Sequence, residues 1–163
     1  MRIGIFVWLM LAGLIPSLAG AQTPDSGLER FTAELVNAYK HPAPESIRPL
    51  MHPKSVACLK AEPKYERYLL RAETMQALPA DAKISVEAVT AAAPLPYRGF
   101  TFPQRPTHVV HMEFGKKVSS DGRSSTTQIS DKYLARSNDR WFLIMPCPTP
   151  EGLGRLRDMG LLD

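Results

Sequence analysis

The chain has 163 residues, with 20 Lys and Arg against 16 Asp and Glu. The positive charges are scattered, and Lys116-Lys117 is the only adjacent pair, so the clustered basic face of a nucleic-acid-binding protein is absent. A small positive charge of this kind favours solubility, with at most a weak attraction to anionic surfaces.

The first 21 residues have the pattern of a secretory signal peptide. Arg2 precedes thirteen uncharged residues, Ile3 to Ile15, and the small residues Ala19-Gly20-Ala21 follow. The apolar run is shorter than the roughly 20 residues that span a bilayer, and no Cys follows it, which excludes a lipoprotein anchor. We expect cleavage between Ala21 and Gln22. Residues 22–163 then form a single periplasmic or secreted domain that carries no stable membrane anchor.

Three helical segments are expected in the first half of that domain. Apolar residues recur at spacings of three and four from Leu28 to Lys40, with Asp25 or Ser26 available as the helix cap. Prolines interrupt the second segment, residues 45–60, which predicts one broken helix or two short turns. The third segment starts with Pro63 in its first turn and ends before Pro79.

The period of the apolar residues changes to two after Asp81, which predicts a strand around Ile84, Val86 and Ala88. Residues 90–106 then hold four prolines and three aromatics, and they predict a long Pro-rich loop. Two interpretations are open. We favour a surface loop whose aromatics Tyr97, Phe100 and Phe102 fold back over the core, and the alternative is a partner-binding arm.

The last third predicts an antiparallel meander of residues 107–118, 124–136 and 141–145, with turns at Asp121-Gly122 and Asn138-Asp139. Two-residue loops place Val110 opposite Tyr133, Phe114 opposite Ile129, Tyr133 opposite Ile144 and Lys132 opposite His111. The other face of this sheet is then expected to carry Val109, His111, Glu113, Lys132, Leu134, Arg136, Trp141 and Leu143. Residues 150–162 predict a weak, Gly-interrupted terminal helix. Helices followed by strands predict an α+β fold, with the helices on one sheet face.

Only two cysteines occur, Cys58 and Cys147, and both lie in the expected mature domain. In an oxidising compartment two such cysteines usually pair. Pro146 and Pro148 flank Cys147 and offer neither a helix N-terminus nor a base, so a catalytic thiolate is not expected. We predict a disulfide between them.

The opening helix, the segment IRPLMHP (residues 47–53) and the closing hairpin NDRWFLIMP (residues 138–146) together resemble the NTF2-like (cystatin-like, SnoaL-type) superfamily. The resemblance implies helices packed on a curved antiparallel sheet, a cone-like shape with a pocket, and frequent homodimers through the sheet. Enzymes of this superfamily place an Asp, His or Tyr in the pocket. The chain matches no catalytic motif of a particular member, so the resemblance does not predict an activity for it.

The candidate metal-binding and catalytic sites all involve histidines. His108 and His111 are three apart on a strand, so they face opposite ways and cannot share a metal ion. His41 and His52 adjoin prolines, and we expect surface or capping roles for them. His111 and Glu113 share a face, so they are the candidate catalytic pair, with His111 as general base. The simpler interpretation, which we favour, is a set of ordinary cross-strand charge pairs.

The sequence therefore predicts a non-catalytic exported domain that binds a small apolar or amphipathic ligand or an envelope protein. The alternative is a pocket enzyme of isomerase or hydrolase type that uses His111. A third hypothesis is a structural module that docks through the Pro-rich loop. No cofactor and no metal site are expected, and a homodimer stays open. The candidate binding residues are Lys132, Arg136 and Trp141.

Overall fold

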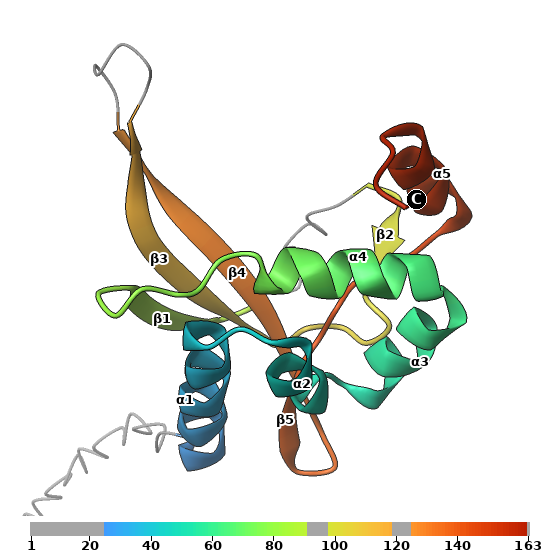
Figure 1. Cartoon of the computed structure of the whole chain (residues 1–163). Coiled ribbons are helices and arrows are strands. Elements are labelled where there is room, and N and C mark those ends of the chain that lie inside the picture. Colours follow the sequence, from blue (N-terminus) through green and yellow to red (C-terminus); the bar gives the residue numbers. More distant parts are fainter. Residues whose placement is uncertain (1–24, 91–97, 119–124, 163) are drawn as a thin grey trace, which may run out of the picture.

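The computed structural model describes residues 25–90, 98–118 and 125–162, and it shows an α+β domain with its first helices N-terminal to the sheet (Figure 1). The main antiparallel sheet has the order β1-β3-β4-β5, formed by β1 (Lys83–Ala88), β3 (His108–Val118), β4 (Ser125–Ser137) and β5 (Arg140–Leu143). A two-stranded sheet joins β2 (Phe100–Thr101) to β6 (Cys147–Pro148). The expected signal peptide, Tyr97 and the turn at Asp121-Gly122 lie outside the described residues.

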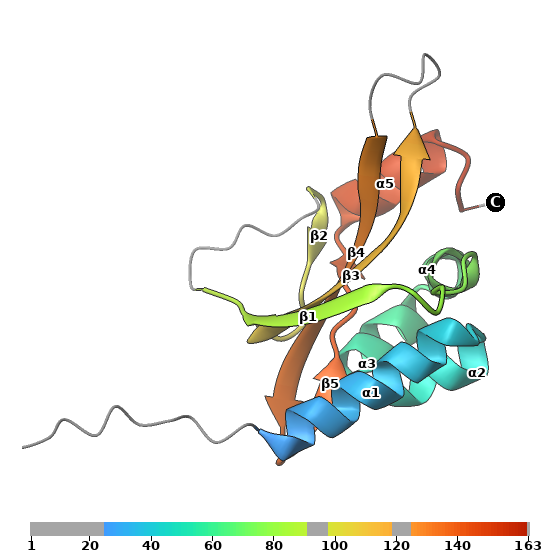
Figure 2. The same cartoon turned by 90° about the vertical axis from the view of Figure 1, so that its left-hand side faces the viewer.

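The helices begin at the prolines and the capping residue that the sequence indicated. Helix α1 (Ser26–Lys40) is capped by Asp25, whose Oδ1 accepts from the Gly27 and Leu28 amides at 2.9 and 3.3 Å. The second segment is broken, as expected, into α2 (Pro44–Ile47), a 3-10 turn η1 (Arg48–Leu50) and α3 (Pro53–Ala61). Helix α4 (Pro63–Thr74) follows, with its proline at the first position. Figure 2 shows these helices on one side of the main sheet and β2 on the other.

The register between β3 and β4 differs from the prediction by one residue. Val110 pairs with Lys132 rather than Tyr133, and Phe114 pairs with Gln128 rather than Ile129. A β-bulge at Gly115, with φ of +61°, inserts one extra residue into β3. Beyond the bulge Lys116 pairs with Thr127, which is the register that a two-residue turn gives.

The register between β4 and β5 is as predicted. Asn138 and Asp139 both have positive φ, 48° and 59°, as a tight two-residue hairpin turn requires. The Ile144 amide donates to the Tyr133 carbonyl at 2.7 Å, which confirms the expected Tyr133–Ile144 pairing.

The bulge changes which residues share a face of the sheet. Lys132, Leu134, Arg136, Trp141 and Leu143 lie on the face of Val110 and Met112, not on that of His111 as predicted. Residue 131, not 132, is therefore opposite His111. The helix-facing side forms the core, in which the buried residues include Leu35, Ile47, Leu59, Val110, Met112, Leu134 and Leu143.

The predicted disulfide is present. Cys58 in α3 and Cys147 in β6 are joined, with their Cα atoms 6.0 Å apart and a sequence separation of 89. The chain around Cys147 is therefore tied to the helical layer, as expected.

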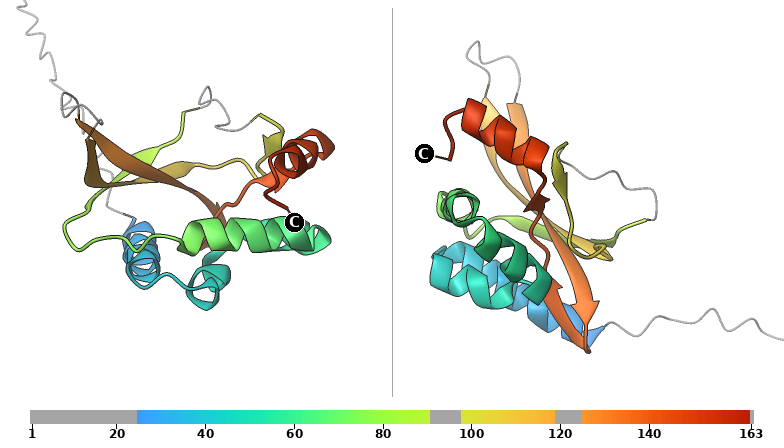
Figure 3. Two further views of the ribbon diagram at one scale, coloured as in Figure 1. Left: turned by 45° about the horizontal axis from the view of Figure 1, so that its top comes forward. Right: turned by 90° about the vertical axis from the view of Figure 1, so that its right-hand side faces the viewer.

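The Pro-rich loop returns to the core, as we favoured, although it also contains the short strand β2. Phe100 lies 5.7 Å from Tyr65 and Phe102 lies 5.0 Å from Tyr133, measured between ring centroids. The terminal helix α5 (Pro150–Asp158) packs beside β2 (Figure 3). Its start is fixed by Thr149, whose Oγ1 donates to the Gly99 carbonyl at 3.0 Å and accepts from the Gly152 amide at 3.3 Å.

Candidate functional site

A groove of about 600 Å³ lies between helix α4, strand β4 and helix α5. Its walls come from α4, β4, α5, the aromatics around β2 and the chain that leaves β5. The residues that line it are Tyr65, Tyr68, Leu69, Ala72, Glu73, Phe100, Phe102, Ile129, Ser130, Asp131, Lys132, Tyr133, Leu143, Ile144, Met145, Pro146, Leu156 and Met159.

The groove exists because the chain leaves the sheet after β5. Strand β4 has 13 residues, whereas β5 has four and covers only the last part of it. The Met145 amide then donates to Ser55 Oγ at 3.0 Å instead of to β4. Pro146 has no amide to donate, and the disulfide holds Cys147 against α3. The WFLIMPCPTP stretch (residues 141–150) therefore directs the chain away from β4 and opens the groove.

Aromatic rings make up much of the groove wall. Tyr65 lies 6.3 Å from Tyr68 and 5.7 Å from Phe100, and its hydroxyl donates to the Pro146 carbonyl at 3.1 Å. This hydrogen bond ties α4 to the diverted chain and keeps both walls in place. Two apolar side chains of the wall remain largely in solvent, with Ile129 63% and Met159 61% exposed. Exposed apolar residues beside a groove are typical of a binding surface.

A polar cluster of Tyr39, Glu73 and Lys132 lies between α1, α4 and β4. Glu73 Oε2 accepts from the Tyr39 hydroxyl and from Lys132 Nζ, both at 2.5 Å. The Lys132 side chain is 11% exposed and lies over the Tyr39 ring, 4.5 Å from its centroid. Burial, and then the neighbouring Glu73 carboxylate, raise the pKa of the Tyr39 phenol well above its usual value, so the phenol stays protonated and donates.

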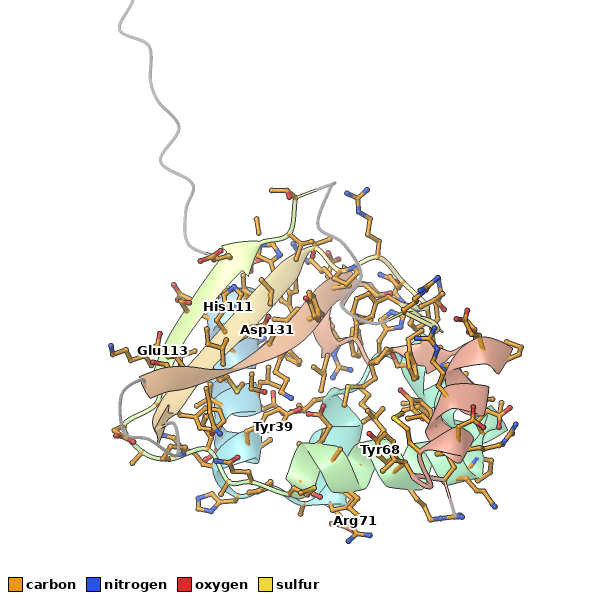
Figure 4. The ribbon with its side chains drawn as sticks, turned by 90° about the horizontal axis from the view of Figure 1, so that it is seen from above. Tyr39, Tyr68, Arg71, His111, Glu113 and Asp131 are labelled. Atoms are coloured by element: carbon orange, nitrogen blue, oxygen red, sulfur yellow. A yellow bond between two sulfur atoms is a disulfide. The ribbon has the colours of Figure 1, made fainter. Side chains whose placement is uncertain are left out.

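His111 lies on the sheet face opposite the helices and outside the groove lining. Its Nδ1–H donates to Asp131 Oδ1 at 2.7 Å, and its Nε2 lies 3.7 Å from Glu87 Oε2. Glu113, the other member of the candidate catalytic pair, places its Oε1 3.8 Å from Lys83 Nζ instead. Figure 4 shows His111 and Asp131 together on the strands, across from Tyr68 on α4. The carboxylate that orients the ring is therefore Asp131.

The candidate binding residues do not form one site. Lys132 lines the groove. Trp141 is buried near the start of α1, where its Nε1 donates to Asp25 Oδ2 at 3.2 Å, and Arg136 lies 3.8 Å from the same oxygen. Both of these residues support the cap of α1 and are absent from the groove lining.

The remaining histidines have structural roles. His52 caps α3, because its Nδ1 accepts from the Lys54 amide at 3.1 Å, and its ring is buried. His41 ends α1. His108 stacks edge-on against Trp141 on the face opposite His111, as its spacing predicted. Among the described residues no group of three His, Cys, Asp or Glu side chains is placed to hold a metal ion.

Sequence reasoning expected a pocket, but it did not identify the elements that form this groove or its polar cluster. Glu73 is one of several charged residues on α4, and no local signal distinguishes it from those that face solvent. The bulge at Gly115 also hid the approach of Asp131 to His111, because a one-residue shift exchanges the faces.

Comparison of the chain with protein-family models, with curated proteins and with solved structures finds no match. No helix within residues 25–90, 98–118 or 125–162 combines the length and apolar character needed to cross a bilayer.

Proposed function

We propose that this chain is an exported, non-catalytic domain that binds an apolar or amphipathic ligand in the groove between α4, β4 and α5. One observation carries the proposal. The groove has a volume of about 600 Å³, within the usual range for ligand sites, and its walls combine aromatic and aliphatic side chains with polar groups, as an amphipathic ligand requires. Its exposed residues Ile129 and Met159 offer apolar surface that a ligand would remove from water.

Two features support export. The first 21 residues have the signal-peptide pattern described above, and the Cys58–Cys147 bond is of the kind that forms and persists in oxidising compartments. The resemblance to the NTF2-like superfamily, with its cone-like shape, stays a prediction, as does the homodimer.

The test compares two exposed methionines, one in the groove lining and one outside it. Met159 lines the groove and is 61% exposed, whereas Met75 is 78% exposed and lies outside the groove lining. The probe is the amphipathic dye 1-anilinonaphthalene-8-sulfonate, titrated by fluorescence into the folded protein. Met159→Ser is expected to weaken dye binding by about tenfold, which corresponds to the loss of about 1.4 kcal/mol of apolar contact. Met75→Ser is expected to leave it unchanged. Equal effects of the two substitutions would contradict the proposal.

A pocket enzyme that uses His111 is the second candidate, and the short contact between His111 and Asp131 is the observation in its favour. Both ring nitrogens, however, lie near carboxylates, and His111 is not part of the groove. Its test is turnover of ester and ketone panels by the wild type and by His111→Ala. Turnover that disappears in the variant, with unchanged thermal stability, would establish the enzyme.

A further inference from the structure

Among the described residues, part of the β4 edge that faces the groove has no strand partner. The Tyr133 carbonyl accepts from the Ile144 amide on this side, and the pairing with β5 ends there. Backbone groups of alternate residues in a strand point the same way, so Asp131 and Ile129 also direct their N–H and C=O groups to this side. Among the described residues no partner meets these four groups. They form a short open template for strand pairing.

The diverted segment after β5 cannot close this edge. Prolines at 146, 148 and 150 deprive the diverted segment of amide donors at alternate positions. The segment is also held elsewhere, because Met145 is bonded to Ser55, and Cys147 to Cys58. A strand beside Ile129 and Asp131 therefore has to come from outside this segment.

The residues that line the groove offer surfaces to such a strand. A strand added to β4 would lie about 4.8 Å from it. Tyr68 and Leu69 on α4 would then contact one of its faces, and Phe102 on the β2 side would contact the other. Leu156 and Met159 on α5 would lie along its far edge. Apolar walls on both faces match an extended segment whose central residues are apolar on both sides.

The charges of the groove favour basic residues at the ends of that segment. Its ionic side chains are Glu73, Asp131 and Lys132, two negative and one positive. Lys132 is already paired with Glu73, whereas Asp131 is engaged through one oxygen, Oδ1, by His111 Nδ1. Among the described residues nothing meets Asp131 Oδ2, so this oxygen can accept from a ligand at the edge. A flanking Lys or Arg would complement it, whereas an acidic residue would be repelled.

We propose that the groove binds an extended, mainly apolar polypeptide segment with basic flanks, which adds as a strand to the open edge of β4. This inference rests on the proposed function and specifies the class of its ligand as a segment of a partner protein. Main-chain hydrogen bonds to Ile129 and Asp131 supply the affinity, and the aromatic walls select the side chains.

The test uses a labelled peptide, acetyl-Lys-Thr-Val-Phe-Val-Thr-Lys-amide, and the same peptide N-methylated on its central residues. Binding to the full domain is followed by fluorescence anisotropy. N-methylation keeps every side chain but removes the donors for strand pairing, so it is expected to weaken binding at least about tenfold. On the protein, Ile129→Pro removes an outward amide that edge strands can spare. Ile129→Thr keeps that amide and is the matched control. The proline variant should lose peptide binding much more than the threonine variant, with both still folded by thermal melting.

The outcomes separate failure of the strand inference from failure of the proposed binding function. If the dye binds the groove but neither peptide does, the strand inference fails and the proposed binding function stands. If both peptides bind equally, side chains alone recognise the ligand, and the inference also fails. If neither dye nor peptide binds, both proposals fail. A concentration-dependent dimer that Ile129→Pro disrupts would show that the edge pairs with a second copy, and this too overturns the inference.

Discussion

Replacing Cys58 and Cys147 by Ala is expected to remove much of the stability of the domain. The bond closes a loop over a sequence separation of 89 residues. In the chain-entropy account, opening a loop of this length costs about 4.6 kcal/mol in the free energy of unfolding. For a domain of this size that loss lowers Tm by roughly 15 to 20 °C. The effect acts mainly through the unfolded chain, which gains freedom when the bond is absent.

The assay is urea unfolding of the oxidised wild type and the double variant at neutral pH, each with and without reductant. Reductant should lower the unfolding free energy of the wild type and leave that of the variant unchanged. The reduced wild type should then match the variant. A difference below about 1 kcal/mol between the oxidised wild type and the variant would refute the reasoning, because the bond would then constrain little of the unfolded chain.

Three further predictions concern packing, charge and pH. Gly152→Ala places a methyl group 1.9 Å from the Gly99 carbonyl oxygen and should cost at least about 3 kcal/mol in urea unfolding. Gly154→Ala meets no atom within 4 Å and should stabilise α5 by about 0.5 to 1 kcal/mol. Glu73→Leu should destabilise by about 3 kcal/mol, because it leaves the Lys132 charge buried and unpaired. The double variant with Lys132→Leu should recover most of that loss, and a double variant as unstable as the single one would contradict this. Burial and then the nearby Lys54 charge lower the pKa of His52, so the unfolded chain binds this proton more readily. The contribution of His52 is complete above pH about 6.5 and is lost as the pH falls through its folded pKa. Melting at pH 7.5 and 5.0 should show a larger loss for the wild type than for His52→Asn, which keeps a capping acceptor, and equal losses would be evidence against it.

Local signals predicted the parts of the fold that depend on neighbouring residues. The prolines at 49, 53 and 63 set the helix boundaries because their effect on the backbone is local. The two cysteines predicted the disulfide because the N-terminal pattern indicated the compartment. The Asn138-Asp139 turn fixed the register of its hairpin.

The remaining features depend on contacts between distant segments. Gly115 gives no sign in the sequence that it forms a bulge, yet the bulge exchanges Lys132 and Asp131 between the faces of the sheet. The groove requires α4, β4 and α5 to meet, and the pairing of Glu73 with Lys132 spans 59 residues of sequence. Periodicity describes one element at a time, so it could not place these residues together.

One segment links the disulfide to the groove. The residues around Pro146 and Cys147 end β5, bind α3 and leave the neighbouring edge of β4 open. The same local chemistry that stabilises the domain therefore creates its candidate binding site.

The most direct test of the open edge is amide hydrogen exchange of the free protein, measured by NMR along β4. An open edge predicts an alternating pattern, in which the amides of Ser130 and Lys132, paired to β3, exchange slowly, and those of Ile129 and Asp131 exchange fast. Slow exchange at all four positions would show that this edge is already paired, and it would contradict the account.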